Sequence, residues 1–554
     1  MSLIKPSATV SNLTLFNGQK FAFESDDKVI IVGPNNSGKS QFLRDILEIL
    51  GANNDRFGIV VNKIELTKST TLESFSAHIK SCARLHNDYY YLDDWSMHQS
   101  DVHCWSFENR LGNSLVNGFV KRIAADDRLN ICQQQDSISP GEPKTKPQHL
   151  LYDDEELMHK VSSLFHQAFN KQLMFDFRGG KKLPIHVGDI PNGIQDRVSN
   201  TYVEAVRSQP SLDQQGDGMK SYAGILFESV VVNKDMTLID EPEAFLHPPQ
   251  MRRLGETLAT EVKGQLFMAT HSSDILRGFL EGTKGKVRIL RIQREGDNNA
   301  ITEAEPETFL QLWQQPNLRY SNALDGIFYE QTIICEDDSD CRLIHAVADY
   351  LEEASGAAWK DTAYVPAGGK HAIPKIAAVL KQIGVPVKAV FDLDFLNEES
   401  MVKNTVEAFG GDWDEIRPNW QVVNADVSAK YKPRSNAEIL NDLKAVVAKS
   451  DENSFTPKKA SEVLKRQGAW HHIKEFGKQA VPSGDATQRF NNLVQQLEKI
   501  GIYLVPVGEM EGFSKDTGKH GPAFVTKLLD EKSLDDPSLQ GLRDFVESVH
   551  QGEV

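Results

Sequence analysis

The chain has 554 residues, of which 40% are hydrophobic and 25% are charged, and its formal net charge is −17. These proportions are ordinary for a soluble globular protein, and the length predicts about three or four domains. The acidic balance argues against a general nucleic-acid binder, because contacts with phosphates need cations, although it leaves room for a local basic groove or a bound metal ion.

The first motif lies in residues 28–40, which read KVIIVGPNNSGKS. An apolar, β-rich run leads into Gly33-x4-Gly38-Lys39-Ser40, and the residues that follow have the apolar spacing of a helix. A strand, a glycine loop and a helix in this order are the context of a P-loop, in which Lys39 binds the β- and γ-phosphates and Ser40 ligates Mg²⁺. The nucleotide-binding residues predicted here are Gly33, Asn35, Asn36, Gly38, Lys39, Ser40 and Gln41, with ATP as the ligand.

Two later strand ends complete this site. Residues 236–248 read MTLIDEPEAFLHP, and we expect Asp240 to hold the Mg²⁺ ion and Glu241 to polarise the attacking water. Residues 265–274 read QLFMATHSSD, and His271 ends that strand at a position where it can contact the γ-phosphate. Taken alone, a histidine at such a position is more often a satisfied core or loop residue.

These motifs resemble the ABC-type ATPase family, in particular the branch that includes SMC and DNA-repair ATPases. The resemblance implies that Glu243–His247 form the D-loop and that His271 is the switch histidine. It also implies a signature motif in QQGDGMKS, residues 214–221, where Gly218 matches the second signature glycine and Gly216 replaces the usual serine. In the family this motif completes the nucleotide site of a second protomer, so we expect a homodimer or a higher homo-oligomer formed through the ATPase domain.

The first two motifs are far apart, which predicts an insertion between them. Residues 136–148 are polar and contain prolines, so we expect an exposed loop, and residues 153–173 have helical spacing. We predict a helical insertion or dimerisation arm over residues 96–195; the alternative is a single large ATPase core with long surface loops. The ATPase would then comprise residues 1–95 and 196–327.

The remainder of the chain alternates strands and helices, which predicts a parallel sheet with its site at the carboxyl ends of the strands. Three of these strand ends are acidic, and any one of them alone would usually be a solvated turn. Carboxylates that converge repel one another unless cations are bound, and oxygen ligands favour Mg²⁺ or Mn²⁺. Two such ions about 4 Å apart suit phosphodiester hydrolysis. The predicted ligands are Glu336 with Asp340, Asp392 with Asp394, and Glu509 with Glu511, besides Ser40 and Asp240 at the nucleotide.

A glutamate followed by a later DxD resembles the Toprim domain of topoisomerases, primases and certain nucleases. The usual first motif is EGxxD, and here Asp337 stands in place of the glycine while Asp340 keeps the second acidic position. An ABC-type ATPase followed by Toprim and a late GExE motif is similar to the OLD (overcoming lysogenisation defect) family of ATP-dependent nucleases. The AGGK stretch at 367–370 and the run over 508–522 also resemble that family.

The resemblance implies an α/β chain in which the ATPase is followed by a Toprim domain over residues 328–400 and 496–554. Residues 401–495 would form a helical insertion within Toprim, and its basic piece, 457–466, would be either a nucleic-acid contact or a solvated helix face. Donors near the scissile phosphate would stabilise developing charge, with Lys370, Lys515, Lys519 and His520 as candidates. The predicted catalytic residues are Glu336, Asp392, Asp394, Glu241, Lys519 and His520.

The leading hypothesis is therefore a Mg²⁺-dependent DNA endonuclease gated by an ATPase, which the resemblance places in bacterial anti-phage defence. A partner protein, or a reverse transcriptase with its RNA–DNA product, is left open. An ATP-driven sensor or clamp with an inactive Toprim, and a nuclease acting on RNA, are the alternatives. A topoisomerase would need a nucleophilic tyrosine in a recognisable context, and none is found.

The sequence also predicts where the protein resides. The five cysteines lack CxxC spacing, which favours neither a disulfide framework nor a structural zinc site. No run of about 18 apolar residues occurs, and residues 1–13 lack the basic region and apolar core of a signal peptide. We therefore expect a cytoplasmic protein that does not contact a membrane.

Overall fold

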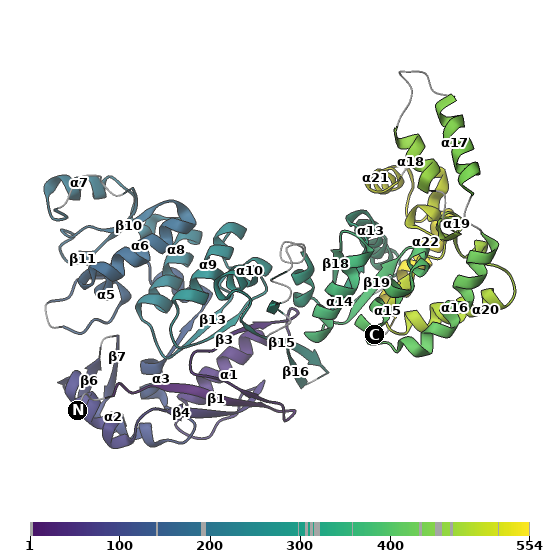
Figure 1. Cartoon of the computed structure of the whole chain (residues 1–554). Helices are drawn as coiled ribbons and strands as arrows, with labels where there is room; N and C mark the ends of the chain where they lie inside the picture. Colours follow the sequence, from purple (N-terminus) through teal and green to yellow (C-terminus); the bar gives the residue numbers. More distant parts are fainter. Residues whose placement is uncertain are drawn as a thin grey trace. The chain divides into compact units, whose positions relative to one another are not determined.

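The chain forms two compact units, residues 1–319 and 320–554, in a computed structural model (Figure 1). Among the described residues, no helix combines the length and the apolar character that crossing a bilayer requires. The structure describes residues 4–92, 94–139, 142–189, 196–296, 298–304, 309–310, 314, 322–356, 358–431, 435–448, 457–465, 469–518 and 520–552.

A six-stranded sheet forms the centre of the first unit. Its strands are parallel except for the antiparallel edge strand β16. The apolar runs of β3, β13 and β14 are buried along almost their whole length, as expected of parallel strands covered on both faces. In spatial order the strands are β16 (Asn298–Glu303), β15 (Arg288–Glu295), β3 (Lys28–Val32), β14 (Gln265–Ala269), β13 (Met236–Asp240) and β8 (Val120–Ile123).

A second, antiparallel sheet shares its core with the main one. Apolar side chains of β1, β4 and α1 lie in the same buried cluster as those of β3 and β15. Helices α9 and α10 pack closely against each other. The absence of a side chain at Gly278 permits this, since a Cβ atom there would lie only 1.9 Å from the carbonyl oxygen of Arg252. These elements are β1 (Ala8–Leu15), β2 (Lys20–Ala22), β4 (Val61–Lys68), α1 (Lys39–Gly51), α9 (Pro248–Glu261) and α10 (Ser273–Thr283).

The predicted helical insertion over 96–195 is wrong in one respect, because this segment contains strand β8 of the main sheet. Residues 120–123 pair in parallel with β13. Four residues with only their ends buried carry too little periodicity to distinguish a strand from a helix. The segment and its surroundings also contain α2 (Leu72–Cys82), β5 (Arg84–His86), β6 (Tyr89–Leu92), β7 (Trp95–His98), α3 (Asn113–Phe119), α4 (Ala125–Asn130), α5 (Pro147–Asp153), α6 (Glu155–Phe169), β10 (Gln172–Phe175), β12 (Ile185–Gly188), α7 (Asn200–Arg207) and α8 (Asp217–Leu226).

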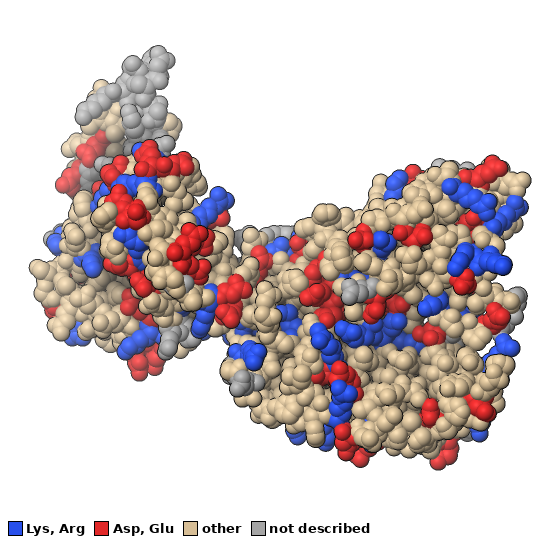
Figure 2. All heavy atoms as spheres, turned by 180° about the vertical axis from the view of Figure 1, so that it is seen from behind, with Lys and Arg blue, Asp and Glu red and all other residues tan. Residues whose placement is uncertain are grey.

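The surface of the first unit is unevenly charged. Figure 2 shows a row of basic side chains across the middle of one face of this unit, with acidic side chains beside it. The net charge of −17 therefore coexists with local concentrations of positive charge.

The second unit has a four-stranded sheet in which every pairing is parallel. Helices α13, α21 and α22 cover one face and share a buried cluster with the strands, while α14 packs against β17 and β19. The strand order is β18 (Thr362–Pro366), β17 (Gln331–Cys335), β19 (Val387–Phe391) and β20 (Ile502–Leu504). The helices are α13 (Asp338–Ser355), α14 (Ile373–Gln382), α21 (Pro522–Glu531) and α22 (Gln540–Gln551).

The described residues between β19 and β20 are mostly helical. Helix α16 packs against α19 and α20, whereas α17 and α18 pack against each other and extend away from the sheet (Figure 1). No described side chain of α17 is buried. Several side chains of the basic piece 457–466 lie outside the described residues, so its two interpretations stay open. The helices are α15 (Glu399–Ala408), α16 (Trp413–Lys430), α17 (Asn436–Ala448), α18 (Pro457–Lys465), α19 (Ala469–Phe476) and α20 (Asp485–Glu498).

Candidate nucleotide site and carboxylate centre

The loop between β3 and α1 has the backbone conformation of a phosphate-binding loop. Gly33 and Gly38 have φ values of 141° and 99°, which favour glycine. A Cβ atom at Gly33 would lie 2.1 Å from the carbonyl oxygen of Ile292, so no other residue fits there. The ammonium group of Lys39 donates to the carbonyl oxygens of Gly33 at 2.9 Å and Pro34 at 2.7 Å. Burial lowers the pKa of Lys39, and three nearby carboxylates oppose this effect.

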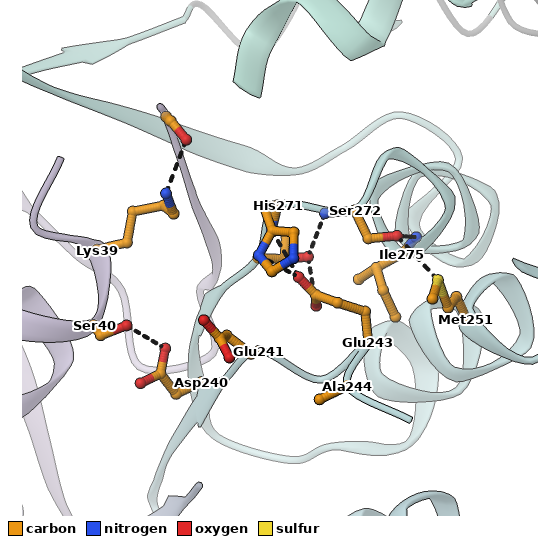
Figure 3. A network of polar contacts seen from close by, with 12 residues as sticks. Lys39, Ser40, Asp240, Glu241, Glu243, Ala244, Met251, His271, Ser272 and Ile275 are labelled. Atoms are coloured by element: carbon orange, nitrogen blue, oxygen red, sulfur yellow. Dashed lines mark hydrogen bonds and ion pairs between the residues drawn. The ribbon is translucent and has the colours of Figure 1, made fainter. Parts of the chain in front are cut away.

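The two predicted Mg²⁺ residues of the nucleotide site lie together. The hydroxyl group of Ser40 donates to a carboxylate oxygen of Asp240 at 2.9 Å (Figure 3). Asp240 ends β13, and α1 begins one residue before Ser40, so the main sheet and the loop fix this pair. The arrangement provides hard oxygen atoms beside the lysine ammonium, as an Mg²⁺–nucleotide complex requires.

The predicted D-loop begins with Glu243, whose contact with His271 the sequence did not predict. The carboxylate of Glu243 is buried and accepts hydrogen bonds at 2.8 Å from the Thr270 hydroxyl and the His271 backbone N–H. Its Oε1 also lies 3.1 Å from Nδ1 of His271. Figure 3 shows these two side chains facing each other. Burial raises the pKa of Glu243, while His271 opposes this effect. Glu243 therefore orients the predicted switch histidine, and its place in the predicted D-loop, directly after Asp240-Glu241-Pro242, was the available signal.

A residue of the segment predicted to be an insertion stabilises the backbone conformation of Glu241. Glu241 has a φ of 49°, and its carbonyl oxygen accepts a hydrogen bond at 2.9 Å from the guanidinium of Arg128, which is fully buried on α4. A positive φ in a non-glycine residue is costly and persists only where contacts impose it. Arg128 supplies one such contact.

The other predicted nucleotide residues are placed less centrally. Asn35 and Asn36 are exposed in the loop, and the Gln41 amide donates to Asp45 at 2.7 Å. Gly218 lies in the first turn of α8, where a Cβ atom would be 2.8 Å from the carbonyl oxygen of Phe245. The signature segment thus begins a helix beside the Glu243–His247 turn.

The second unit brings three of the predicted metal ligands together. Glu336 follows β17, Asp392 and Asp394 follow β19, and one oxygen atom of each lies within 4.8 Å of the others. Burial, and then the charges of the two aspartates, raise the pKa of Glu336 to about 7. Among the described atoms, Oε1 of Glu336 and Oδ1 of Asp394 are buried without a hydrogen-bond partner. Unpaired buried carboxylate oxygens are the ligands that a hard divalent cation satisfies, so this set fits Mg²⁺ or Mn²⁺.

The acidic run after β17 divides into residues with different contacts. Asp337 caps α13, since its carboxylate accepts from the backbone N–H groups of Ser339 at 2.8 Å and Asp340 at 3.2 Å. Burial, and then the charge of Asp337, raises the pKa of Asp340 to about 8. The charges of Asp392, Glu511 and Glu336 raise this pKa further. Asp338 is exposed and pairs with Arg342 at 2.7 Å.

Glu509 and Glu511 form a second set with His520. One ligand atom of each lies within 4.8 Å of the others, and Glu511 also accepts from the backbone N–H of Gly521 at 2.8 Å. The strand that precedes this set, β20, ends at Leu504. Pro506 has no N–H to donate, so the strand pairing cannot continue through it.

Among the described residues, Lys370 and Lys474 contact the clustered carboxylates, and only Lys370 was predicted. The Lys370 ammonium lies 3.1 Å from Asp394, whereas Lys515 donates to the carbonyl oxygen of Glu475. Lys519 lies outside the described residues. The unpredicted cation is Lys474 of α19, whose ammonium lies 2.6 Å from Asp392. No acidic motif surrounds Lys474 in the sequence, so only the tertiary fold reveals this contact.

Comparisons with known proteins identify a domain type in each unit. The family model "AAA domain, putative AbiEii toxin, Type IV TA system" matches residues 126–277, and the model "Overcoming lysogenization defect protein-like, TOPRIM domain" matches residues 327–394. The Old nuclease of Escherichia phage P2 is 23% identical over 172 residues, which cover 29% of this chain and 28% of that protein. The matched part is thus less than a third of that relative's length.

Solved SMC head domains are also similar, at low scores. An SMC head bound to the C-terminal winged-helix domain of ScpA has 13% identity and a TM-score of 0.34, covering 55% of this chain and 99% of its own. The SMC head of Thermotoga maritima has 12% identity and a TM-score of 0.28, covering 55% and 100%.

The fold and the family models together define the class of the chain, a P-loop ATPase domain followed by a Toprim domain. Within that class, residues 327–394 match the OLD-like Toprim model, and part of the chain is similar to the Old nuclease of phage P2. The domain combination predicted from the motifs is confirmed.

Proposed function

We propose that this protein is an ATPase and a divalent-metal-dependent nuclease that cleaves DNA. The observation that carries the proposal is the set of Glu336, Asp392 and Asp394, whose oxygen atoms lie within 4.8 Å of one another at one edge of a parallel sheet. A divalent ion held there would supply Lewis-acid stabilisation of a scissile phosphate. The resemblance of the Toprim domain to topoisomerases and nucleases favours DNA as the substrate.

The chain's own residues have distinct roles in this proposal. Glu336, Asp392 and Asp394 hold the ion, and Glu509 with Glu511 offers a second acidic set across the same strand edge. Lys370, which already contacts Asp394 at 3.1 Å, is placed to neutralise charge near the phosphate. In the ATPase, Lys39 binds the terminal phosphates and Glu241 orients the attacking water. ATP binding would bring two protomers together through the segment that contains Gly218.

One experiment tests the nuclease. Purified protein is incubated with supercoiled DNA, linear DNA or RNA, in Mg²⁺, Mn²⁺ or EDTA, with and without ATP. The double variant Asp392→Asn with Asp394→Asn should lose metal-dependent cleavage and retain ATP hydrolysis. Asp338→Asn is the matched control, because this aspartate lies in the same acidic run but is exposed and pairs with Arg342 on the surface. Cleavage by the double variant would refute the site, and cleavage of RNA alone would refute DNA as the substrate.

We also propose a role in bacterial anti-phage defence, which would place the protein in the cytoplasm. The OLD-like Toprim domain supports this proposal. Phage plaques would be counted on cells that express the wild type or the Asp392→Asn, Asp394→Asn variant. Equal plaque numbers across a broad phage panel would contradict a defensive role. Purification of the tagged protein from such cells would reveal a partner protein or an RNA–DNA molecule if one is bound.

A further inference from the structure

A lysine of the helical segment contacts both acidic sets of the second unit. The ammonium of Lys474 lies 2.6 Å from Oδ2 of Asp392 and 3.8 Å from a carboxylate oxygen of Glu509. Its side chain is 28% exposed, and that of Asp392 is 15% exposed. Asp392 is at the same time one of the three clustered carboxylates that fit a divalent ion. Lys474 and a divalent ion are therefore directed at the same carboxylate.

Packing of the helix backbone fixes the position of this lysine. Gly508 has a φ of 106°, and a Cβ atom there would lie 1.9 Å from the carbonyl oxygen of Lys474. A Cβ atom at Gly477 would lie 2.7 Å from the backbone of Val507. The N–H of Lys478 donates to the carbonyl oxygen of Pro506 at 2.9 Å. Helix α19 therefore packs directly against the loop that leads to Glu509, and this packing fixes the position of the Lys474 ammonium.

Further contacts hold α19 from its other sides. The indole N–H of Trp470 donates to the Asn424 side chain of α16 at 2.7 Å. The Lys515 ammonium donates to the carbonyl oxygen of Glu475 at 2.8 Å. These bonds come from two different parts of the chain, so Lys474 has little freedom to move away with its helix.

Electrostatics makes the two cations competitors. An ammonium and a divalent ion that share one carboxylate repel each other, and this repulsion is strong where burial limits solvent screening. We propose that Lys474 is an internal counter-ion of the carboxylate centre, which a divalent ion has to displace from Asp392, so that the helical segment sets the metal affinity of the centre. This inference rests on the metal-binding role in the proposed function.

Metal titration tests the proposal without relying on cleavage. Mn²⁺ binding to the full chain is measured by calorimetry and by electron paramagnetic resonance for the wild type and for Lys474→Met, which keeps the aliphatic length of the side chain. ATP is absent, and Ser40→Ala with Asp240→Asn is present in every protein compared, the reference included, to remove the predicted ligands of the nucleotide-site ion. Lys474→Met should bind Mn²⁺ about tenfold more tightly, the factor expected for removal of a partly buried charged hydrogen bond. Lys478→Met, whose lysine is exposed just beyond α19, is the matched control and should bind as the wild type does.

Thermal unfolding gives a second measurement, which remains informative if a variant is less stable than the wild type. Without Mn²⁺, Lys474→Met should melt at a lower temperature than the wild type, because its carboxylates lose their counter-ion, and Mn²⁺ should raise its melting temperature by more. Lys474→Gln should behave in the same way, and Lys474→Arg should resemble the wild type.

The outcomes separate this inference from the proposed function. Equal or weaker Mn²⁺ binding by both Lys474→Met and Lys474→Gln would overturn the inference. If cleavage were lost while Mn²⁺ affinity stayed unchanged, Lys474 would contact the substrate instead, and the inference would again be wrong. If the wild-type centre bound no divalent ion, the proposed function itself would fail, and the inference with it.

Discussion

The cap of α13 is the place where a departure from the Toprim pattern has a measurable energetic consequence. Asp337 stands where the usual motif has glycine. Its carboxylate accepts hydrogen bonds from the backbone N–H groups of Ser339 at 2.8 Å and Asp340 at 3.2 Å. Replacing such a cap by alanine costs about 1 kcal/mol, whereas glycine costs only a few tenths and asparagine caps nearly as well. We therefore expect the free energy of unfolding to decrease in the order wild type, Asp337→Asn, Asp337→Gly, Asp337→Ala.

The assay is thermal unfolding of the full chain in EDTA, followed by circular dichroism and by calorimetry. For a unit of this size, the alanine variant should melt roughly 2–4 °C below the wild type if the loss is near 1 kcal/mol. All variants should retain metal-dependent cleavage, because the cap does not belong to the clustered carboxylates. A glycine variant as unstable as the alanine variant would refute the capping argument. Loss of cleavage in Asp337→Asn, which keeps the cap and removes the charge, would show that this carboxylate acts at the metal.

Three further predictions concern the nucleotide site and the carboxylates. Lys39→Ala should weaken ATP binding by about tenfold or more, measured with a fluorescent ATP analogue, and normal binding would refute the P-loop assignment. In contrast, Glu241→Gln should bind ATP normally and lower the rate of ATP hydrolysis by about a hundredfold. Glu243→Gln should lower ATP hydrolysis by roughly tenfold with little change in ATP affinity, because it loosens the switch histidine; unchanged hydrolysis would contradict an orienting role. In EDTA the melting temperature should fall between about pH 5 and about pH 8, because the folded-state pKa values of Glu336 (about 7) and Asp340 (about 8) lie above their unfolded values. The stability that these groups contribute at low pH is lost as each ionises in the folded protein, and saturating Mn²⁺ should remove most of this dependence; a melting temperature that rises with pH in EDTA would contradict it.

Sequence reasoning succeeded where the chemistry lies next to a strand end. The P-loop and Asp240 follow apolar strands of the first unit's sheet, and the Asp392–Asp394 pair follows a strand of the second unit's sheet, so the parallel order of the strands places each group at the carboxyl edge of its own sheet. Local sequence therefore contained both the residue type and its position. The family models confirm the resulting domain combination.

Sequence reasoning failed where a position depends on tertiary packing. Lys474 lies 82 residues after Asp392, and nothing near it in the sequence is acidic enough to mark a contact. Strand β8 has only four residues, and its place in the sheet depends on pairing with β13. Arg128 is a charged residue that the fold buries completely, which no pattern in the sequence would predict.

The described helices between β19 and β20 differ in how closely they pack near the acidic edge. Substitutions in α19 would alter a helix that contacts the acidic edge, so drift there would change how the centre binds ions. Helix α17 buries none of its described side chains, and its length and sequence can diverge without disturbing that edge. Related chains should therefore preserve the inner helix while exchanging or shortening the outer one. The outer helix is also the natural place to fuse a reporter or to graft a recognition peptide.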